Sequence, residues 1–332
     1  MWEAQPANPR YGVPPPGICD VLRPDKCRNQ SIGGTRCPLI NKSIERPPAE
    51  IVQGFRNLLS PIGIFDSGVG GLSILREIRR AFANEDLLYV ADSAFVPYGD
   101  KSPHFVEARS VAIAEFLVGR NAKAIVVACN TATGAAITTL RSRFSVPIIG
   151  IEPAVKPAVE KTASRIVVVL ATSGTLSSDK FAKLLARFGG DADILIQPCA
   201  GLVEQVETGE LHGEKTRALT AKYLLPLLAR GADTIILGCT HYSFLAPLIR
   251  EIARPRVSIV DPNAAIALDL RRRLDGNDLL SPDPRSGTER FWTSGAPDDV
   301  KPVISQLWNV AVQVRRLPER YCRQDILFNS QG

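Results

Sequence analysis

The sequence lacks the features that would place it in a membrane or in the secretory pathway. No apolar run approaches the roughly 20 residues that a membrane-spanning helix requires. The N-terminus lacks the basic and then apolar layout of a secretory signal. We therefore expect a cytoplasmic protein with no membrane partner.

The sequence also has a small net charge and few aromatic residues. The net charge is +6 for 332 residues, and aromatic residues make up 6% of the chain. The body of the chain has no dense run of Lys and Arg and no basic stripe with interleaved aromatics, so nucleic-acid binding is not indicated. The modest positive charge is explained equally well by a small anionic substrate as by nucleic acid.

The cysteines do not form the pattern of a disulfide framework or of a zinc site. There are seven, an odd number, which leaves individual thiols as candidates for chemistry. Cys19, Cys27 and Cys37 lie at wide and irregular intervals, unlike the paired ligands of a structural zinc site. We therefore predict no metal site.

Residues 1–60 are rich in Pro, Gly, Asn and Arg and show neither helical nor strand periodicity. This composition predicts a flexible N-terminal extension. Met1 is the only methionine, which raises the hypothesis that translation begins downstream, for example near Val52 or Leu58. The intact mass of the protein from its natural host would test that hypothesis.

From Pro61 onward, short apolar runs alternate with amphipathic segments. Strands that are apolar throughout and separated by helices are typical of parallel sheets covered on both faces. We predict an α/β fold of two similar domains with parallel-rich central sheets, related by a pseudo-twofold axis, and an active site in the cleft between them. The predicted strands are residues 62–65, 87–91, 124–128, 147–151, 166–170, 194–197, 234–237 and 257–260, and the predicted helices include 72–83, 105–119, 178–187, 215–228 and 264–273.

A weak internal repeat indicates that the two domains are duplicates. In the first half one strand is followed by Asp66 and a later one by Cys129; in the second half Thr172 and Cys239 follow strands at a similar interval. Ligands of parallel sheets lie beyond the carboxyl ends of the strands, so the two thiols would approach a ligand from opposite sides. The predicted domains are 61–152 plus 263–310, and 153–262, followed by a C-terminal tail, 311–332.

Cys129 and Cys239 each stand directly after a buried strand and before side chains that open a helix. Backbone N–H groups and the helix dipole would lower the thiol pKa from about 8.5. A single such cysteine is more simply a small buried apolar residue, but two in matching contexts favour function. Inverting an α-carbon requires acid/base groups on both faces, and a thiolate and a thiol can exchange those roles.

Neighbouring ionisable groups could tune the thiols. Asp66 could assist Cys129, and His241 could assist Cys239, although His241 alone could equally be a structural histidine. Hydroxyl donors to the same ligand could come from residues just past strand ends: Thr131, Thr172, Thr175 and Thr240.

The glycine-rich run at residues 66–73 resembles a dinucleotide-binding turn only superficially. Ser73 stands where that pattern needs a small residue, usually Gly, and Asp92 is the nearest acidic candidate for a ribose contact. We predict no bound nucleotide. The glycines would instead let backbone N–H groups approach a carboxylate.

Together these segments closely resemble the bacterial glutamate racemases of the aspartate/glutamate racemase superfamily. The resemblance covers residues 61–308 and leaves residues 1–60 and the C-terminal tail outside it. Any one motif is weak, but the ordered set is specific: IFDSGVGGL at 64–72, ADS at 91–93, PYG at 97–99, CNTA at 129–132, IEPA at 151–154, ATSGT at 171–175 and GCTHY at 238–242.

The resemblance implies interconversion of L- and D-glutamate without pyridoxal phosphate, metal or nucleotide, supplying D-glutamate for peptidoglycan, by a homodimer. It implies that Cys129 and Cys239 alternate as proton donor and acceptor, with Cys129 facing the α-proton of D-glutamate. Asp66, Glu152 and His241 would be the supporting ionisable groups. The substrate would be held by Asp66, Ser67, Tyr98, Gly99, Asn130, Thr131, Thr172, Thr240 and His241.

Three alternatives remain open. A sister racemase would use the same cysteines on aspartate or another small acid, although the run at 239–242 favours glutamate. A two-domain binding protein would capture an amino acid without chemistry, but would not need a thiol on each side. A cysteine hydrolase would use Cys239 with His241, residues too close in sequence for the usual nucleophile and base. Such a hydrolase should survive substitution of Cys129, whereas a racemase should not.

Overall fold

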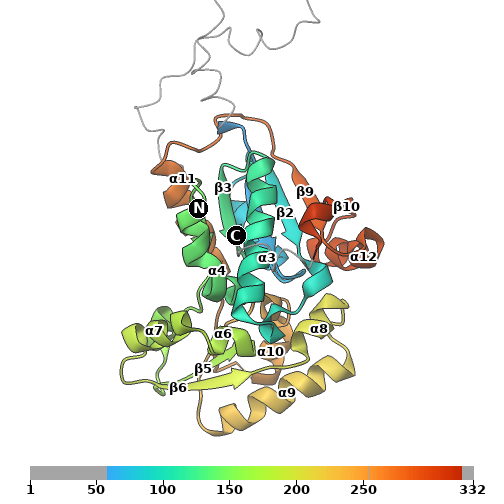
Figure 1. Cartoon of the computed structure of the whole chain (residues 1–332). Helices are drawn as coiled ribbons and strands as arrows, with labels where there is room; N and C mark the ends of the chain where they lie inside the picture. The colour runs from blue at the N-terminus through green and yellow to red at the C-terminus, as the bar shows by residue number, and fades with distance from the viewer. Residues whose placement is uncertain (1–57, 254, 324–332) are drawn as a thin grey trace, which may run out of the picture. The chain divides into compact units, whose positions relative to one another are not determined.

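A computed structural model describes residues 58–253 and 255–323 (Figure 1). The predictions made for Cys19, Cys27, Cys37, for the extension up to residue 57 and for the end of the tail from residue 324 lie outside the described residues. Within the described residues, no helix has the length and apolar character needed to cross a membrane.

Two sheets, both entirely parallel, form the framework of the described chain, and this confirms the predicted α/β class. The larger sheet has the order β10-β9-β2-β1-β3-β4, and the smaller has the order β6-β5-β7-β8. The strands are β1 (Ile62–Asp66), β2 (Leu87–Ala91), β3 (Ala124–Val127), β4 (Ile148–Gly150), β5 (Ile166–Ala171), β6 (Asp193–Pro198), β7 (Thr234–Leu237), β8 (Ser258–Val260), β9 (Glu289–Thr293) and β10 (Val314–Arg316).

The two sheets repeat the same topology. In each sheet, four strands that follow one another along the chain lie side by side in the order second, first, third and fourth: β2-β1-β3-β4 and β6-β5-β7-β8. The repeat inferred from sequence spacing is therefore present in the strand order. Cys129 and Cys239 come just after the equivalent third strands, β3 and β7.

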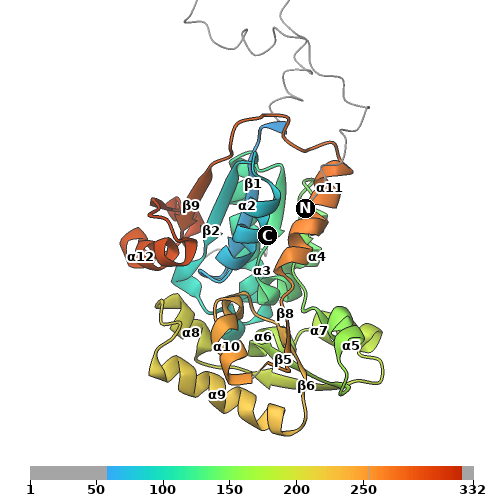
Figure 2. The ribbon, with the colours of Figure 1, turned by 180° about the vertical axis from the view of Figure 1, so that it is seen from behind.

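Helices cover both faces of the larger sheet. Figure 1 shows α3 and α4 on one face, and Figure 2 shows α2 and α11 on the other. This cover explains why every residue of β1 and β2 is buried. The helices are α2 (Leu72–Ala81), α3 (Pro103–Gly119), α4 (Asn130–Arg143), α5 (Val155–Lys161), α6 (Ser173–Leu176), α7 (Asp179–Phe188), α8 (Leu202–Glu207), α9 (Glu214–Ala229), α10 (Ala246–Ala253), α11 (Asn263–Asp275) and α12 (Pro297–Trp308), with short 3₁₀ segments η2 (Ser93–Phe95), η3 (Tyr98–Asp100), η4 (Thr240–Ser243) and η5 (Glu319–Tyr321).

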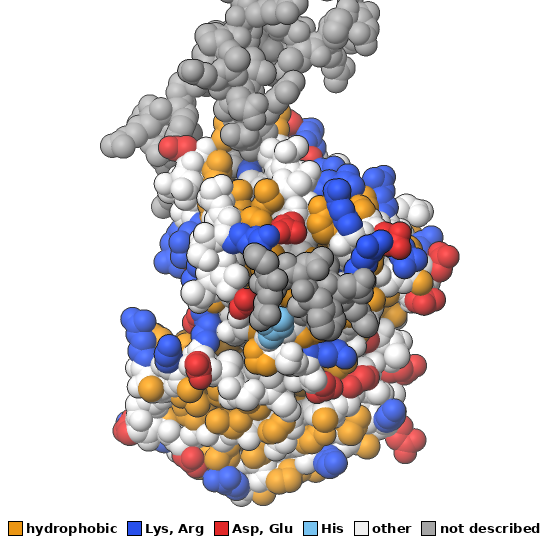
Figure 3. Space-filling model, viewed as in Figure 1, with side chains coloured by type: hydrophobic (Ala, Val, Ile, Leu, Met, Phe, Trp, Pro, Cys, Tyr) orange, Lys and Arg blue, Asp and Glu red, His pale blue; other side chains and the backbone are white. Residues whose placement is uncertain are grey.

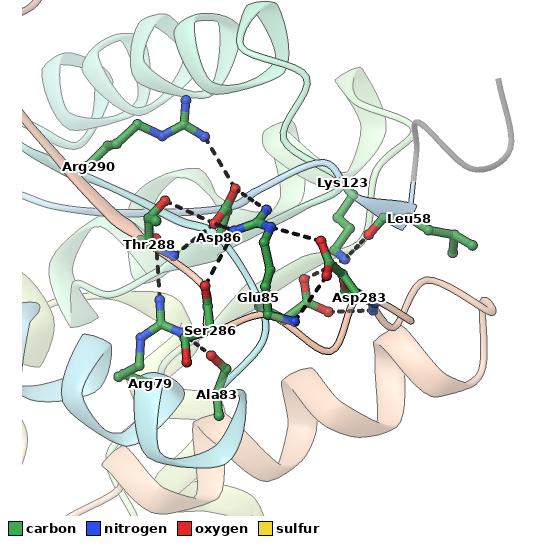
Figure 4. Close-up of polar contacts among 12 residues, drawn as sticks. Leu58, Arg79, Ala83, Glu85, Asp86, Lys123, Asp283, Ser286, Thr288 and Arg290 are labelled. Carbon is green, nitrogen blue, oxygen red and sulfur yellow. Dashed lines mark hydrogen bonds and ion pairs between the residues drawn. The ribbon is translucent and has the colours of Figure 1, made fainter. Parts of the chain in front are cut away.

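A polar cluster ties the connection between α11 and β9 to the amino-terminal end of β2 (Figure 4). Lys123 Nζ lies 2.6 Å from a Glu85 carboxylate oxygen, and both side chains are almost fully buried. The same ammonium group donates to the carbonyl of Leu58. Next to this pair, Asp86 accepts hydrogen bonds from the guanidinium of Arg285. This cluster lies at the amino ends of the strands, whereas ligands of parallel sheets lie at the carboxyl ends, so we assign the cluster a role in stabilising the fold.

Two strands of the larger sheet were not predicted. β9 pairs with β2, and β10 pairs with β9 at the edge of the sheet. β10 lies within the predicted tail, 311–332. The predicted domains stay a prediction: β1 to β4 fall in 61–152, β9 in 263–310 and β5 to β8 in 153–262.

The charged side chains on the face shown in Figure 3 are of both signs. Lys and Arg are interspersed with Asp and Glu across this face.

Candidate active site

Both predicted catalytic cysteines line one cavity at the carboxyl ends of the two sheets. Cys129 and Cys239 are 5% and 7% exposed, so both thiols lie in a narrow and nearly closed space. The cavity is lined by Ser67, Pro97, Tyr98, Gly99, Cys129, Asn130, Thr131, Thr172, Thr175, Val203, Cys239, Thr240 and His241.

Cys129 is the N-cap residue of α4. The backbone N–H of Ala132 donates to its sulfur at 3.5 Å, as expected for a side chain at a helix start. The thiol in turn donates to Ser67 Oγ at 3.8 Å. Burial and the nearby charge of Asp66 nevertheless raise the pKa of Cys129 well above its ordinary value. The predicted lowering of this pKa is therefore wrong, because desolvation outweighs the helix terminus. Cys129 rests as a protonated thiol.

Cys239 has a different electrostatic environment. It precedes the 3₁₀ turn η4 and not the expected α-helix. Its sulfur lies 3.6 Å from His241 Nδ1, and His241 Nε2 lies 2.6 Å from Glu207 Oε1. Burial would lower the pKa of His241, but the hydrogen bonds and charges of Cys239 and Glu207 raise it well above its ordinary value. The resulting imidazolium stabilises negative charge on the Cys239 sulfur.

Glu207 is the member of this group that sequence reasoning missed. It is the last residue of α8, whose Leu202 and Val206 are buried, so on sequence alone its carboxylate looks like part of a solvated helix face. Its Oε1 accepts both from His241 and from the backbone N–H of Val69, at 2.8 Å. A Cβ at Gly68 would lie 1.9 Å from that oxygen, so only glycine permits the approach.

Asp66 lies at the end of β1 and is fully buried. Its carboxylate accepts from the backbone N–H groups of Ser67 at 2.7 Å and Gly71 at 2.5 Å, and from the hydroxyl of Thr240 at 3.2 Å. Burial raises the pKa of Asp66. The carboxylates that accept from the glycine-rich run therefore belong to the protein itself. The backbone N–H of Gly71 donates to Asp66, and that of Val69 donates to Glu207.

The cavity also contains polar groups that could receive a ligand. Within residues 58–253 and 255–323, neither the amide nitrogen nor the amide oxygen of buried Asn130 has a hydrogen-bond partner. A buried amide without partners is costly, so this group is suited to a ligand. Thr131 Oγ1 lies 2.9 Å from Thr172 Oγ1 and 3.1 Å from Thr175 Oγ1, which joins the two halves of the cavity wall.

Tyr98 and Gly99 reach the cavity from the short segment η3. The Tyr98 hydroxyl donates to Asp92 Oδ2 at 2.5 Å, so this hydroxyl is already engaged. A Cβ at Gly99 would lie 2.7 Å from Thr172 Cβ, so the two halves of the cavity wall meet closely here.

The structure does not bring Glu152 into this group. Glu152 follows β4, the edge strand of the larger sheet, and its side chain is 46% exposed. Its carboxylate lies 2.7 Å from Lys180 Nζ of α7, and it does not line the cysteine cavity. The other residues predicted for the site do lie together: Cys129, Cys239, His241, Ser67, Tyr98, Gly99, Asn130, Thr131, Thr172 and Thr240 line the cavity, and Asp66 contacts Ser67 and Thr240.

Comparisons with known proteins agree with this geometry. The family model described as Asp/Glu/Hydantoin racemase matches residues 62–270. A glutamate racemase of Methylococcus capsulatus is 51% identical over 265 residues, which are 80% of this chain and 98% of the relative. One of Pseudomonas aeruginosa is 49% identical over 257 residues, 77% of this chain and 97% of the relative.

Solved structures show the same fold. The crystal structure of a glutamate racemase from Bacillus anthracis matches with a TM-score of 0.72 and 31% identity, covering 78% of this chain and 97% of the other. The Escherichia coli glutamate racemase, in complex with L-glutamate and the activator UDP-MurNAc-ala, matches with a TM-score of 0.69 and 31% identity, covering 77% and 98%. The chain belongs to the Asp/Glu/Hydantoin racemase family and, within it, to the glutamate racemases.

Proposed function

We propose that this protein interconverts L- and D-glutamate by moving the α-proton between Cys129 and Cys239, with no cofactor or metal. The observation that carries the proposal is that these two thiols, at equivalent strand ends of duplicated sheets, line one cavity. A binding protein would not need this pair, and a hydrolase would need only one of the two.

The surroundings of Cys129 and the contact of Cys239 with His241 suit the following step from L-glutamate. With L-glutamate bound, the Cys239 thiolate beside imidazolium His241 removes the α-proton, and the Cys129 thiol delivers its own proton to the opposite face. Turnover leaves Cys239 protonated and Cys129 as the thiolate, which is the form that takes the α-proton of D-glutamate. The raised pKa of Cys129 supports its role as the acid in the first direction.

The cavity would hold glutamate mainly through neutral donors. Among the described residues that line it, none is Lys or Arg. Hydroxyl groups of Ser67, Thr131 and Thr240, the amide of Asn130 and nearby backbone N–H groups are the available donors. Fixed donors in a dry site stabilise the negative charge that develops when the α-proton leaves.

The test follows the α-proton of L-glutamate in D₂O by NMR, together with optical rotation, using protein dialysed free of cofactors. Deuterium should enter the product as rotation falls, and L-aspartate should not react. Cys129→Ser and Cys239→Ser should each abolish racemisation, whereas Cys199→Ser should retain it. Cys199 is a suitable control because it is buried outside this cavity, and its thiol donates to the carbonyl of Gln197.

Two outcomes would contradict the proposal. If the unaltered protein exchanges the α-proton of neither amino acid, the racemase function is wrong. If Cys129→Ser retains full racemisation, the two-thiol mechanism is wrong even though the activity stands.

We further propose that the product supplies peptidoglycan synthesis, that the protein acts in the cytoplasm and that it forms a homodimer. The resemblance to glutamate racemases supports these assignments. Restoring growth of a bacterium that requires D-glutamate would test the first. Fractionation of the natural host would test the second, and light scattering of the purified full chain would test the third.

A further inference from the structure

Arg109 is a buried cation in the middle of α3. Its side chain is 2% exposed, although a buried guanidinium requires partners for its charge and its donors. Asp92 supplies two of these contacts, accepting from Nε at 3.0 Å and from Nη2 at 2.8 Å. The guanidinium also lies over the ring of Phe95, 4.2 Å from its centroid. These contacts leave donors that Asp92 does not occupy.

The C-terminal segment 319–323 receives the remaining donors. Arg109 Nη2 donates to the carbonyl of Tyr321 at 2.7 Å, and Nη1 donates to the carbonyl of Arg323 at 3.4 Å. The segment is itself anchored, because the ring of Tyr321 packs edge-on against Phe116 of α3, with centroids 5.5 Å apart. Residues from the C-terminal end therefore complete the surroundings of a buried charge in α3.

Asp92 connects this arrangement to the candidate active site. The carboxylate oxygen that accepts from Arg109 Nε also accepts the Tyr98 hydroxyl, at 2.5 Å. Tyr98 belongs to the segment 97–99, which lines the cysteine cavity. The orientation of Asp92 therefore fixes the ring of Tyr98, and Arg109 fixes the orientation of Asp92.

We propose that residues 319–323 are a positioning element for the substrate-binding segment 97–99, acting through Arg109 and Asp92. The inference rests on the proposed function, because it assigns segment 97–99 to substrate binding. Arg109 and residues 319–323 touch no reacting atom, so their loss acts on substrate affinity. We therefore expect the effect to appear in KM and not in kcat.

Two truncations of the full chain test the proposal. Removing 319–332 takes away both carbonyls, whereas the matched control, removing only 324–332, keeps them. The first should raise KM for L-glutamate about tenfold over the control, with kcat changed by less than about twofold. Hydrogen–deuterium exchange in the peptide spanning 93–100 should also be faster in the first truncation. Equal KM and equal exchange in the two truncations would overturn the proposal.

A point variant keeps the test decisive if the longer truncation fails to fold. Arg109→Lys retains a charge for Asp92 but cannot supply the forked donors that reach both Asp92 and Tyr321. Its control is Arg120→Lys, at the end of the same helix, where the guanidinium lies over Phe116 and Trp292. Arg109→Lys should raise KM and accelerate exchange in 93–100 relative to that control, and equality of the two variants would refute the coupling. The exchange measurement uses unliganded protein, so it judges the coupling even if glutamate is not the substrate.

Discussion

Glu207→Gln should slow racemisation while leaving the fold intact. The substitution keeps the shape of the side chain and an oxygen that can accept from the N–H of Val69, but it removes the negative charge 2.6 Å from His241 Nε2. The same oxygen can still accept from His241, so the loss is the excess of a charged over a neutral hydrogen bond, about 1–1.5 kcal/mol. Loss of that amount in the transition state corresponds to a fall of about 5- to 13-fold in kcat/KM.

The substitution Glu207→Gln should also shift the pH profile of kcat/KM in one direction. Glu207 helps to raise the pKa of His241, so its neutralisation lowers that pKa. The imidazolium beside Cys239 is then lost at lower pH, and the alkaline limb of the kcat/KM profile should move to lower pH.

The assay measures initial rates in both directions across pH, with a melting curve for each protein. Glu204→Gln is the matched control, because Glu204 lies on the same helix with an exposed side chain outside the cysteine cavity. Since L- and D-glutamate have equal free energy in achiral solution, kcat/KM must fall equally in both directions. A Glu207→Gln protein that keeps the rate and the pH profile of Glu204→Gln would refute the assigned role.

Three further predictions concern stability and local space. Lys123→Met should lower the free energy of unfolding by about 3–5 kcal/mol in urea titrations, because it leaves Glu85 buried without its partner; a loss below about 1 kcal/mol would contradict this. Contacts with Arg285 and Thr288 lower the pKa of Asp86 to about 2 despite its partial burial, compared with about 3.9 in the unfolded chain. Asp86 therefore stabilises the fold above about pH 4, and this stabilisation is lost as pH falls towards 2. Asp86→Asn should therefore cost about 1 kcal/mol at pH 7, after allowance for solvent screening, and progressively less as pH falls from 4 towards 2, and a cost that does not change with pH would refute the assignment. Gly70→Ala should lower the melting temperature and reduce kcat/KM by more than about tenfold in the folded protein, since the added Cβ would lie 2.4 Å from Nδ1 of buried His241. Unchanged turnover would show that His241 can shift without consequence.

The strands that the sequence predicted well are those buried on both faces. The strands predicted at 87–91 and 234–237 have the bounds of β2 and β7, because each segment is almost entirely apolar. β10 consists of Val314–Arg316, with two arginines among its three residues, and it exists only because β9 offers an edge to pair with. Short edge strands of this kind carry almost no local signal.

The site could be predicted where it follows from strand ends, and not where it depends on packing between distant segments. Cys129 and Cys239 were found from their positions after equivalent strands. Glu207 lies in a helix, and only the tertiary fold brings it to His241. Glu152 fits the strand-end rule, yet its position on an edge strand turns it to Lys180. The same limit applies to the pKa of Cys129, because burial is a property of the whole fold.

The duplicated halves share a topology but differ in the charge around each thiol. Asp66 disfavours a negative charge on Cys129, whereas imidazolium His241 favours one on Cys239. In each direction of the reaction one thiol acts as the base and the other as the acid, and the roles reverse with the direction. The difference cannot make either enantiomer the preferred product, since the equilibrium constant is unity and kcat/KM is equal in the two directions. We therefore expect it to appear as unequal values of kcat, matched by equally unequal values of KM, for L- and D-glutamate.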